Sequence, residues 1–277
     1  MPKRPVAVRM VWILGIAACG YLALCLAAFL LQRKLLYFPV RWTASEARRA
    51  NPGYDEIQVR TSDGEEIHGW LNRVEDSPWT VLIFHGNAGN LMYHEAPLEI
   101  FRAIGLQAIL FDYRGYGLSS GSPSEVGLLR DGEAIRDYAV STLGVPPERL
   151  IYFGQSLGSG VAVLLAASKP PGRLIVESGY PALPAVAGVH YPFLPAGLLM
   201  QDRFAAAEKI ASVKCPILFL HPGLDEVIPI ALGRALYDAA NDPKRFVEIP
   251  GAHHNDAFQV SLDRHVAAIA QFLSTPP

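Results

Sequence analysis

The feature that most constrains the fold is a series of short, continuous apolar runs separated by longer helical patterns. Each run is typical of a strand that is buried on both faces of a sheet. Strands that alternate with helices predict an α/β fold with a mostly parallel sheet flanked by helices. The expected strands are residues 79–84, 106–112, 150–154, 172–177, 216–221 and 244–250, and the clearest helical patterns are 125–143, 157–168 and 262–273.

Two further strands are expected before this series. Residues 56–61 and 65–72 are expected to form antiparallel strands, and Ser62-Asp63-Gly64 between them favours a tight turn. The whole pattern fits one large domain from residue 32 to the end of the 277-residue chain.

An uncharged apolar run occupies residues 11–31, which is about the ~20 residues needed to span a bilayer. We interpret it as an uncleaved membrane anchor behind a basic tail, residues 1–10, so a lipid bilayer is an expected partner. A cleaved signal and a buried core helix are the alternatives; Ile16–Cys19 resembles a lipoprotein cleavage box, but the run continues well past it. Basic residues flank both ends and leave the orientation open: Lys3, Arg4, Arg9, Arg33, Lys34 and Arg41.

Charge and cysteine content exclude several classes. The net charge of −2 gives no basic surface for nucleic acid, so no nucleic-acid partner is expected. Three cysteines cannot form a disulfide framework. No H-E-x-x-H motif is present, and we expect neither a metal nor an organic cofactor.

One segment interrupts the alternation. Residues 178–213 are rich in proline and apolar side chains and contain no clear strand. An insertion of this kind between two strands predicts a lid or cap that faces the substrate. Ordinary helical packing is the alternative.

The sequence Gly154-Gln155-Ser156-Leu157-Gly158 lies directly between an expected strand and an expected helix. This G-x-S-x-G motif in a strand–turn–helix context predicts a nucleophile elbow with Ser156 as the nucleophile. The small residues at Gly154 and Gly158 are needed because the serine must adopt a strained backbone. A purely structural turn is the alternative.

A nucleophilic serine needs a general base and an acid that orients the base, in the chain order serine, acid, histidine. Asp225 follows the strand 216–221 and is the expected acid, in preference to its neighbour Glu226. His253 and His254 both follow the last strand, and spacing alone does not choose between them as the base.

The oxyanion hole is expected to use two backbone N–H groups. One belongs to Leu157, the residue after the nucleophile. The other belongs to Asn87, in the loop after the strand 79–84, where Gly86 allows a close approach of the backbone. A simple strand-to-helix turn is the alternative for this loop.

Five motifs occur in order at compatible spacing: "LIFHGNAGN", "FDYRGYGLSSGSPSE", "GQSLGSGVAVLLA", "HPGLDEVIP" and "GAHHND". Together with "KLLYFP" after the apolar run, they resemble the α/β-hydrolase superfamily, and more narrowly the bud-emergence-related group classed beside serine aminopeptidases. The resemblance covers residue 32 to the C-terminus. It implies an α/β-hydrolase fold, and the retained "HND" favours His254 over His253 as the base.

The resemblance implies acyl transfer to water through Ser156, His254 and Asp225, acting on a small-molecule or acyl-protein ester or thioester. Two other classes stay open. A peptidase would hold the substrate's amine with acidic lid residues, and the lid segment contains only Asp202 and Glu208 as acids. A non-catalytic hydrolase-like scaffold would commonly lack a triad member, and none is missing here.

Overall fold

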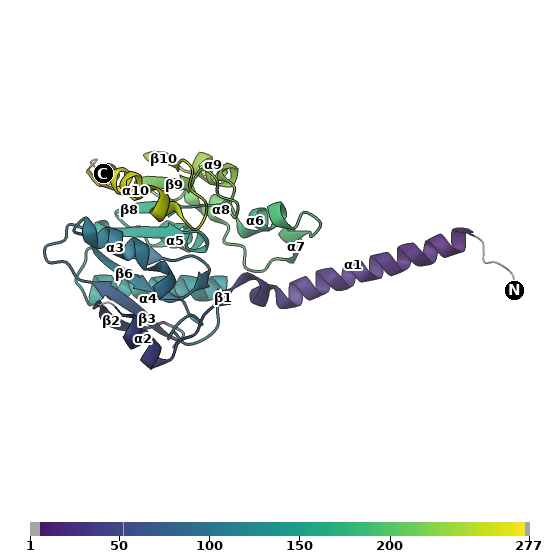
Figure 1. Cartoon of the computed structure of the whole chain (residues 1–277), viewed down its shortest axis with the longest axis horizontal. Helices are drawn as coiled ribbons and strands as arrows, with labels where there is room; N and C mark the ends of the chain where they lie inside the picture. The colour runs from purple at the N-terminus through teal and green to yellow at the C-terminus, as the bar shows by residue number, and fades with distance from the viewer. Residues whose placement is uncertain (1–5, 52, 275–277) are drawn as a thin grey trace.

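The computed structural model describes residues 6–51 and 53–274. An eight-stranded sheet in the order β10-β9-β8-β7-β4-β6-β3-β2 forms the centre of the domain (Figure 1). Only β2 and β6 pair antiparallel, each with β3, so the predicted mostly parallel sheet and the antiparallel pair are both confirmed. The strands are β2 (Asp55–Arg60), β3 (Glu66–Asn72), β4 (Thr80–Phe84), β6 (Gln107–Phe111), β7 (Leu150–Gln155), β8 (Arg173–Glu177), β9 (Ile217–Pro222) and β10 (Lys244–Ile249).

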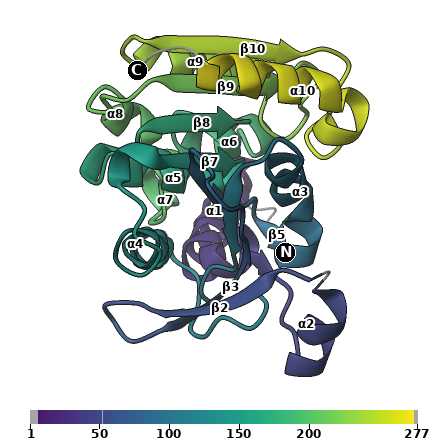
Figure 2. The ribbon, with the colours of Figure 1, turned by 90° about the vertical axis from the view of Figure 1, so that its left-hand side faces the viewer.

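Helices cover both faces of the sheet, which explains why its strands are continuously apolar (Figure 2). Leu82 and Phe84 of β4 pack into the core beneath α4 and α5, whereas Val81 and Ile83 pack into the core beneath α3 and α10. The covering helices are α3 (Glu95–Ala103) and α10 (Ala257–Ser274) on one face, and α4 (Glu125–Ser141), α5 (Leu157–Ser168) and α9 (Ile230–Ala239) on the other.

The last helix begins earlier than the predicted residue 262. Helix α10 starts at Ala257 and is interrupted at Ser261, whose φ of −151° and ψ of 54° are not helical. The regular part after this break agrees with the prediction. The extra first turn forms because the Asp256 carbonyl accepts a hydrogen bond from the Val260 N–H, and this turn continues directly from the histidine loop.

Helix α1 (Val6–Leu36) projects from the domain and extends past both ends of the predicted anchor (Figure 1). Its segment Val8–Leu36 is long and apolar enough to cross a membrane and is almost entirely exposed, so the interpretation as a core helix is wrong. The junction predicted at residues 31/32 falls inside this helix. Of the predicted basic tail, residues 1–5 lie outside the described residues.

The end of α1 is joined to the loop that follows β4. Strand β1 (Phe38–Pro39) pairs in parallel with β5 (Ala88–Gly89). Helix α2 (Ala44–Ala50) then begins with a capping box, in which Thr43 and Glu46 bond each other's backbone N–H groups. The end of α1 and the loop after β4 are therefore one connected structure.

The segment 178–213 contains three short helices and no strand, in agreement with the sequence. They are α6 (Leu183–His190), α7 (Ala196–Leu199) and α8 (Ala206–Ile210). Helices α6 and α7 lie beside the part of α1 that joins the domain (Figure 1). Two 3₁₀ turns, η1 (Leu91–His94) and η2 (Pro147–Arg149), complete the described elements.

Candidate active site

Ser156 occupies a sharp turn between β7 and α5, with φ of 52° and ψ of −122°. This left-handed backbone is strained for a residue with a side chain. It is accommodated because its neighbours are small: a Cβ at Gly154 would overlap the Gly158 carbonyl, and a Cβ at Gly158 would overlap the Phe84 carbonyl. The strand–turn–helix context expected from G-x-S-x-G is therefore present, and it raises the serine hydroxyl above the end of the sheet.

A chain of hydrogen bonds joins Ser156 to His254 and Asp225. The Nε2 of His254 lies 3.0 Å from Ser156 Oγ, and its Nδ1 lies 2.9 and 2.8 Å from the two carboxylate oxygens of Asp225. Because a carboxylate can only accept, Nδ1 donates to Asp225, and Nε2 is therefore the ring nitrogen that can accept the hydroxyl proton. The three residues follow β7, β9 and β10, and they come together because the C-terminal ends of these parallel strands lie on the same side of the domain.

Asp225 is held in place by groups besides His254. Its buried carboxylate accepts hydrogen bonds from Ser178 Oγ at 2.8 Å and from the N–H groups of Val227 and Ile228 at 3.0 and 2.7 Å. Burial disfavours ionisation, but the hydrogen bonds, that of His254 foremost, outweigh it and hold the pKa of Asp225 below its usual value. Asp225 is therefore a fixed anion at neutral pH.

The neighbouring residues Glu226 and His253 lie outside this chain of hydrogen bonds. His253 is exposed, and its Nδ1 lies 3.1 Å from the Glu226 carboxylate, which is also exposed. The structure thus brings Asp225 and His254 to Ser156 and pairs their two neighbours with each other at the surface.

The two expected oxyanion donors lie beside Ser156. Leu157 is the first residue of α5, where backbone N–H groups have no partner within the helix. A Cβ at Gly86 would lie 3.7 Å from the Cβ of Ser156, so the loop before Asn87 approaches the serine closely. The Asn87 side chain is fixed from two sides: its amide donates to the Leu36 carbonyl at the end of α1, and its oxygen accepts from Tyr116.

Ser156 and His254 open into a cavity of about 720 Å³ with a mainly apolar lining. Its walls come from parts of the chain that are far apart in the sequence. They include Leu36 at the end of α1 and Phe38 and Val40 after it, Leu183 and Val186 of α6, Tyr93 and His94 of η1, and Phe258 of α10. The sequence analysis predicted that the segment 178–213, which contains Leu183 and Val186, faces the substrate, but it named none of these wall residues individually, nor Ser178 as a partner of Asp225. "KLLYFP" was the only local signal for Leu36 and Phe38.

Charged residues of the "FDYRG" motif stabilise loops. The Arg114 guanidinium bonds Asp131 at 2.8 Å and Asp63 at 2.9 Å. Asp112 is fully buried and accepts the Leu91 N–H at 2.9 Å. In the described part of the chain, no three His, Cys, Asp or Glu side chains converge as metal ligands would.

Glu177 is a buried acid directly behind the site. Gln155 Nε2 donates to one of its oxygens at 3.3 Å, while the other has no hydrogen-bond partner and lies 3.9 Å from His265 Nε2. Burial raises the pKa of Glu177 to about 8 and lowers the pKa of His265. Both side chains are therefore neutral at pH 7.

We expect Glu177→Gln to stabilise the protein at alkaline pH. An unfolded glutamate loses its proton near pH 4.3, whereas folded Glu177 keeps it to about pH 8. The folded state therefore binds one more proton between these values, and the free energy of unfolding falls as pH rises through this window. Gln cannot ionise, so at pH 9 the variant should be more stable than the parent by a few kcal/mol, at about 1.4 kcal/mol per pKa unit.

Denaturant unfolding of the full chain in detergent micelles at pH 5, 7 and 9 measures this difference. Near pH 5 the two proteins should be almost equally stable. The exposed Glu99→Gln is the matched control; because it keeps Glu177, it should be about as stable as the parent at all three pH values. A Glu177→Gln variant less stable than the parent at pH 9 would mean that Glu177 is charged and paired with His265.

Comparison with known proteins agrees with this architecture. A family model described as the alpha/beta hydrolase fold matches residues 80–175. The uncharacterized protein Rv2307c of Mycobacterium tuberculosis (strain H37Rv) is 37% identical over 98% of this chain and 96% of its own length. Alpha/beta hydrolase domain-containing protein WAV2 of Arabidopsis thaliana is 30% identical over 87% of each chain, and Schizosaccharomyces pombe bem46 is 30% identical over 88% of this chain and 86% of its own.

Solved structures share the fold at low sequence identity. The Pyrococcus furiosus esterase Pf2001 superimposes with a TM-score of 0.70 at 20% identity, covering 86% of this chain and 97% of the esterase. An alpha-beta serine hydrolase homologue from Coxiella burnetii gives a TM-score of 0.62 at 19% identity, covering 78% and 96%. With the identity to bem46 and WAV2 over most of their length, these findings establish that the chain belongs to the α/β-hydrolase family.

Proposed function

We propose that the protein is a membrane-anchored serine hydrolase that cleaves carboxylic ester or thioester bonds of small-molecule or acyl-protein substrates. The observation that carries this proposal is the hydrogen-bonded chain from Ser156 through His254 to Asp225. It supports an enzyme over a hydrolase-like scaffold, because a scaffold has no need of an assembled triad. Esterases among the structural neighbours point to the same chemistry.

In this mechanism His254 Nε2 takes the proton of Ser156 as Oγ attacks the substrate carbonyl. Asp225 fixes the ring through Nδ1–H and stabilises the imidazolium that forms. The N–H groups of Asn87 and Leu157 bind the oxyanion. His254 then gives its proton to the departing alcohol or thiol, and the same residue activates the water that releases the acid from Ser156.

The lid favours an ester or thioester over a peptide. Asp202, which could have bound a substrate amine, is buried and paired with Arg33 and Tyr37. Glu208 is exposed on α8 and does not line the cavity. The apolar cavity walls suit an acyl chain instead.

The anchor interpretation is supported by the way α1 ends. Its uncharged run is long enough to cross a bilayer, and its last residue, Leu36, forms part of the cavity wall. Cleavage after a signal sequence would separate most of this helix from the domain that it contacts.

The substrate prediction can be tested with the full chain in detergent micelles. A fluorophosphonate probe should label the protein, and kcat/KM for p-nitrophenyl esters and acyl thioesters should rise with chain length. Burial of each added methylene is worth about 0.8 kcal/mol, so the gain should reach up to about fourfold per methylene until the cavity is full. A folded protein that resists the probe would favour the scaffold, and preference for aminoacyl arylamides would favour the peptidase.

A further inference from the structure

The exposed tip of the lid is unusually apolar. No Asp, Glu, Lys or Arg occurs between Glu177 and Asp202. Within this stretch the residues 189–199, here called the lid tip, comprise the end of α6, the loop after it and all of α7. Four large side chains of the tip are exposed: Val189 at 49%, Tyr191 at 54%, Phe193 at 58% and Leu198 at 86%.

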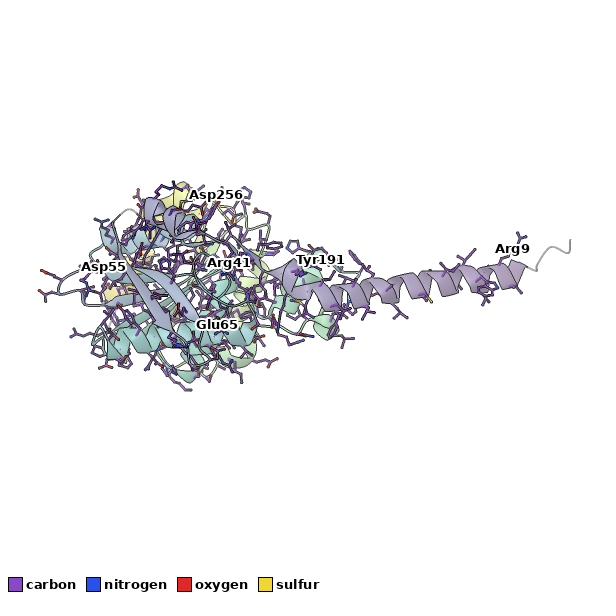
Figure 3. All side chains as sticks on the ribbon, turned by 90° about the horizontal axis from the view of Figure 1, so that it is seen from below. Arg9, Arg41, Asp55, Glu65, Tyr191 and Asp256 are labelled. Carbon is purple, nitrogen blue, oxygen red and sulfur yellow. The ribbon has the colours of Figure 1, made fainter. Side chains whose placement is uncertain are left out.

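The lid tip lies along the C-terminal half of α1. The Tyr21 hydroxyl donates a hydrogen bond to the Phe193 carbonyl at 2.8 Å, and Gln32 Nε2 donates one to the Leu199 carbonyl at 3.2 Å. Figure 3 shows Tyr191 beside the domain end of α1, whereas Arg9 marks the far end of the helix. The tip therefore contacts the uncharged part of α1, between Tyr21 and Gln32.

The first charged residue after the apolar run of α1 lies next to the first charged residue after the lid tip. Arg33 is the first charged residue of α1 after the apolar run, Asp202 is the first after the lid tip, and the two form an ion pair at 3.0 Å. Tyr21 precedes Arg33 by twelve residues, or about 18 Å of helix. One leaflet of a ~30 Å hydrocarbon core is of comparable depth.

We propose that the lid tip inserts into the same membrane leaflet as the C-terminal half of α1, with the acyl region of the lipid bilayer as its partner. This inference rests on the proposed membrane anchorage. A spanning α1 places its uncharged run in the hydrocarbon core, and the contact between Tyr21 and Phe193 brings the tip in with it.

The backbone of the tip is compatible with lipid, where unpaired polar groups are costly. Pro192 and Pro195 have no N–H, and the N–H groups of Leu194, Ala196 and Leu198 donate to carbonyls of the tip itself. His190 is the only histidine between Ser178 and Gln201, and its Nε2 bonds the Val227 carbonyl at 2.8 Å.

Insertion of the tip would connect the active site to the leaflet. Leu183 and Val186 belong to α6, which leads into the tip, and they line the same cavity as Leu36 of α1. A substrate whose acyl chain is dissolved in the leaflet could enter between these elements and reach Ser156 with its chain still in apolar surroundings.

Depth-dependent fluorescence quenching tests the proposal. In a full-length background with Cys19→Ala, Cys25→Ala and Cys215→Ala, an environment-sensitive fluorophore is attached through Phe193→Cys or, in a second variant, Leu198→Cys. Ile16→Cys on α1 reports on the anchor. Glu148→Cys is the control, because Glu148 lies just before the N-terminal end of β7 and Ser156 follows the C-terminal end of the same strand. Each protein is reconstituted into phosphatidylcholine vesicles with or without doxyl-labelled lipid, and fluorophosphonate labelling checks the site separately.

We expect the labels at positions 193, 198 and 16 to shift to shorter emission wavelength and to lose most of their fluorescence to the doxyl lipid. The label at position 148 should do neither. Quenching at 16 but not at 193 or 198 would overturn the inserted tip and leave the anchor intact. Absence of quenching at all positions would overturn the anchor and the tip together, while a wavelength shift at 193 without quenching would assign the tip to a protein partner, such as a second copy of the chain.

Discussion

Replacement of Ser156 by Ala is expected to abolish fluorophosphonate labelling and to lower kcat/KM for ester hydrolysis by about 10⁴- to 10⁶-fold. The hydroxyl oxygen is the only atom of this side chain that can attack a substrate, and it lies 3.0 Å from His254 Nε2, which would take its proton. The members of such a triad act as a unit, so loss of the nucleophile removes the benefit of the other two.

The fold should survive this change. Alanine has a Cβ like serine, and the strain of the turn, with its φ of 52°, is therefore about the same in both proteins. An unchanged unfolding transition would show that the loss of rate is a loss of chemistry.

Ser168→Ala is the matched control, because Ser168 lies at the far end of the same helix α5 and bonds only the carbonyls of the preceding turn. It should retain the parent's labelling and rate. If Ser156→Ala were still labelled at the parent's rate, another residue would have to be the nucleophile, and the proposed mechanism would be wrong.

The sheet could be predicted from the sequence because its strands are buried on both faces. In β4 every residue from Thr80 to Phe84 is buried, and such a continuous run stands out in the sequence. The start of α10 could not be predicted in the same way. The break at Ser261 depends on the local conformation of one residue, and the apolar period of the helix is regular only after it.

The site was predictable where chain order and local motif determine it. Ser156 follows β7 directly, and Asp225 and His254 follow β9 and β10, so strand positions alone bring these loops together. The cavity wall was not predictable, because Leu36 reaches it from α1 while Leu183 and Val186 reach it from α6, and this meeting depends on contacts between distant parts of the chain.

Adjacent residues are a harder problem for sequence reasoning. Whether His253 or His254 faces Ser156 depends on the conformation of a short loop. In the structure the His253 N–H donates to the Asp256 carboxylate at 2.6 Å, and the His253 ring bonds Glu226. These contacts direct the His253 side chain outward and leave the inward position to His254.

This arrangement predicts opposite outcomes for two neighbouring substitutions. His254→Ala should lower kcat/KM by about 10⁴- to 10⁶-fold, since the ring takes the proton of Ser156 and carries the charge that Asp225 stabilises. His253→Ala removes only an exposed contact with Glu226, and exposed pairs are worth about 0–1 kcal/mol, so the rate should change by no more than about fivefold.

Steady-state hydrolysis of one ester by both variants, with unfolding transitions measured in parallel, separates these effects. Because the two substitutions are adjacent and remove the same side chain, they form a matched pair in which only the contacts differ. A large loss from His253→Ala with the fold intact, and a small loss from His254→Ala, would assign the base to His253 and require the loop to rearrange when substrate binds. The predicted order instead follows from the structure as it stands, in which one imidazole already joins the buried carboxylate to the serine and the other faces solvent.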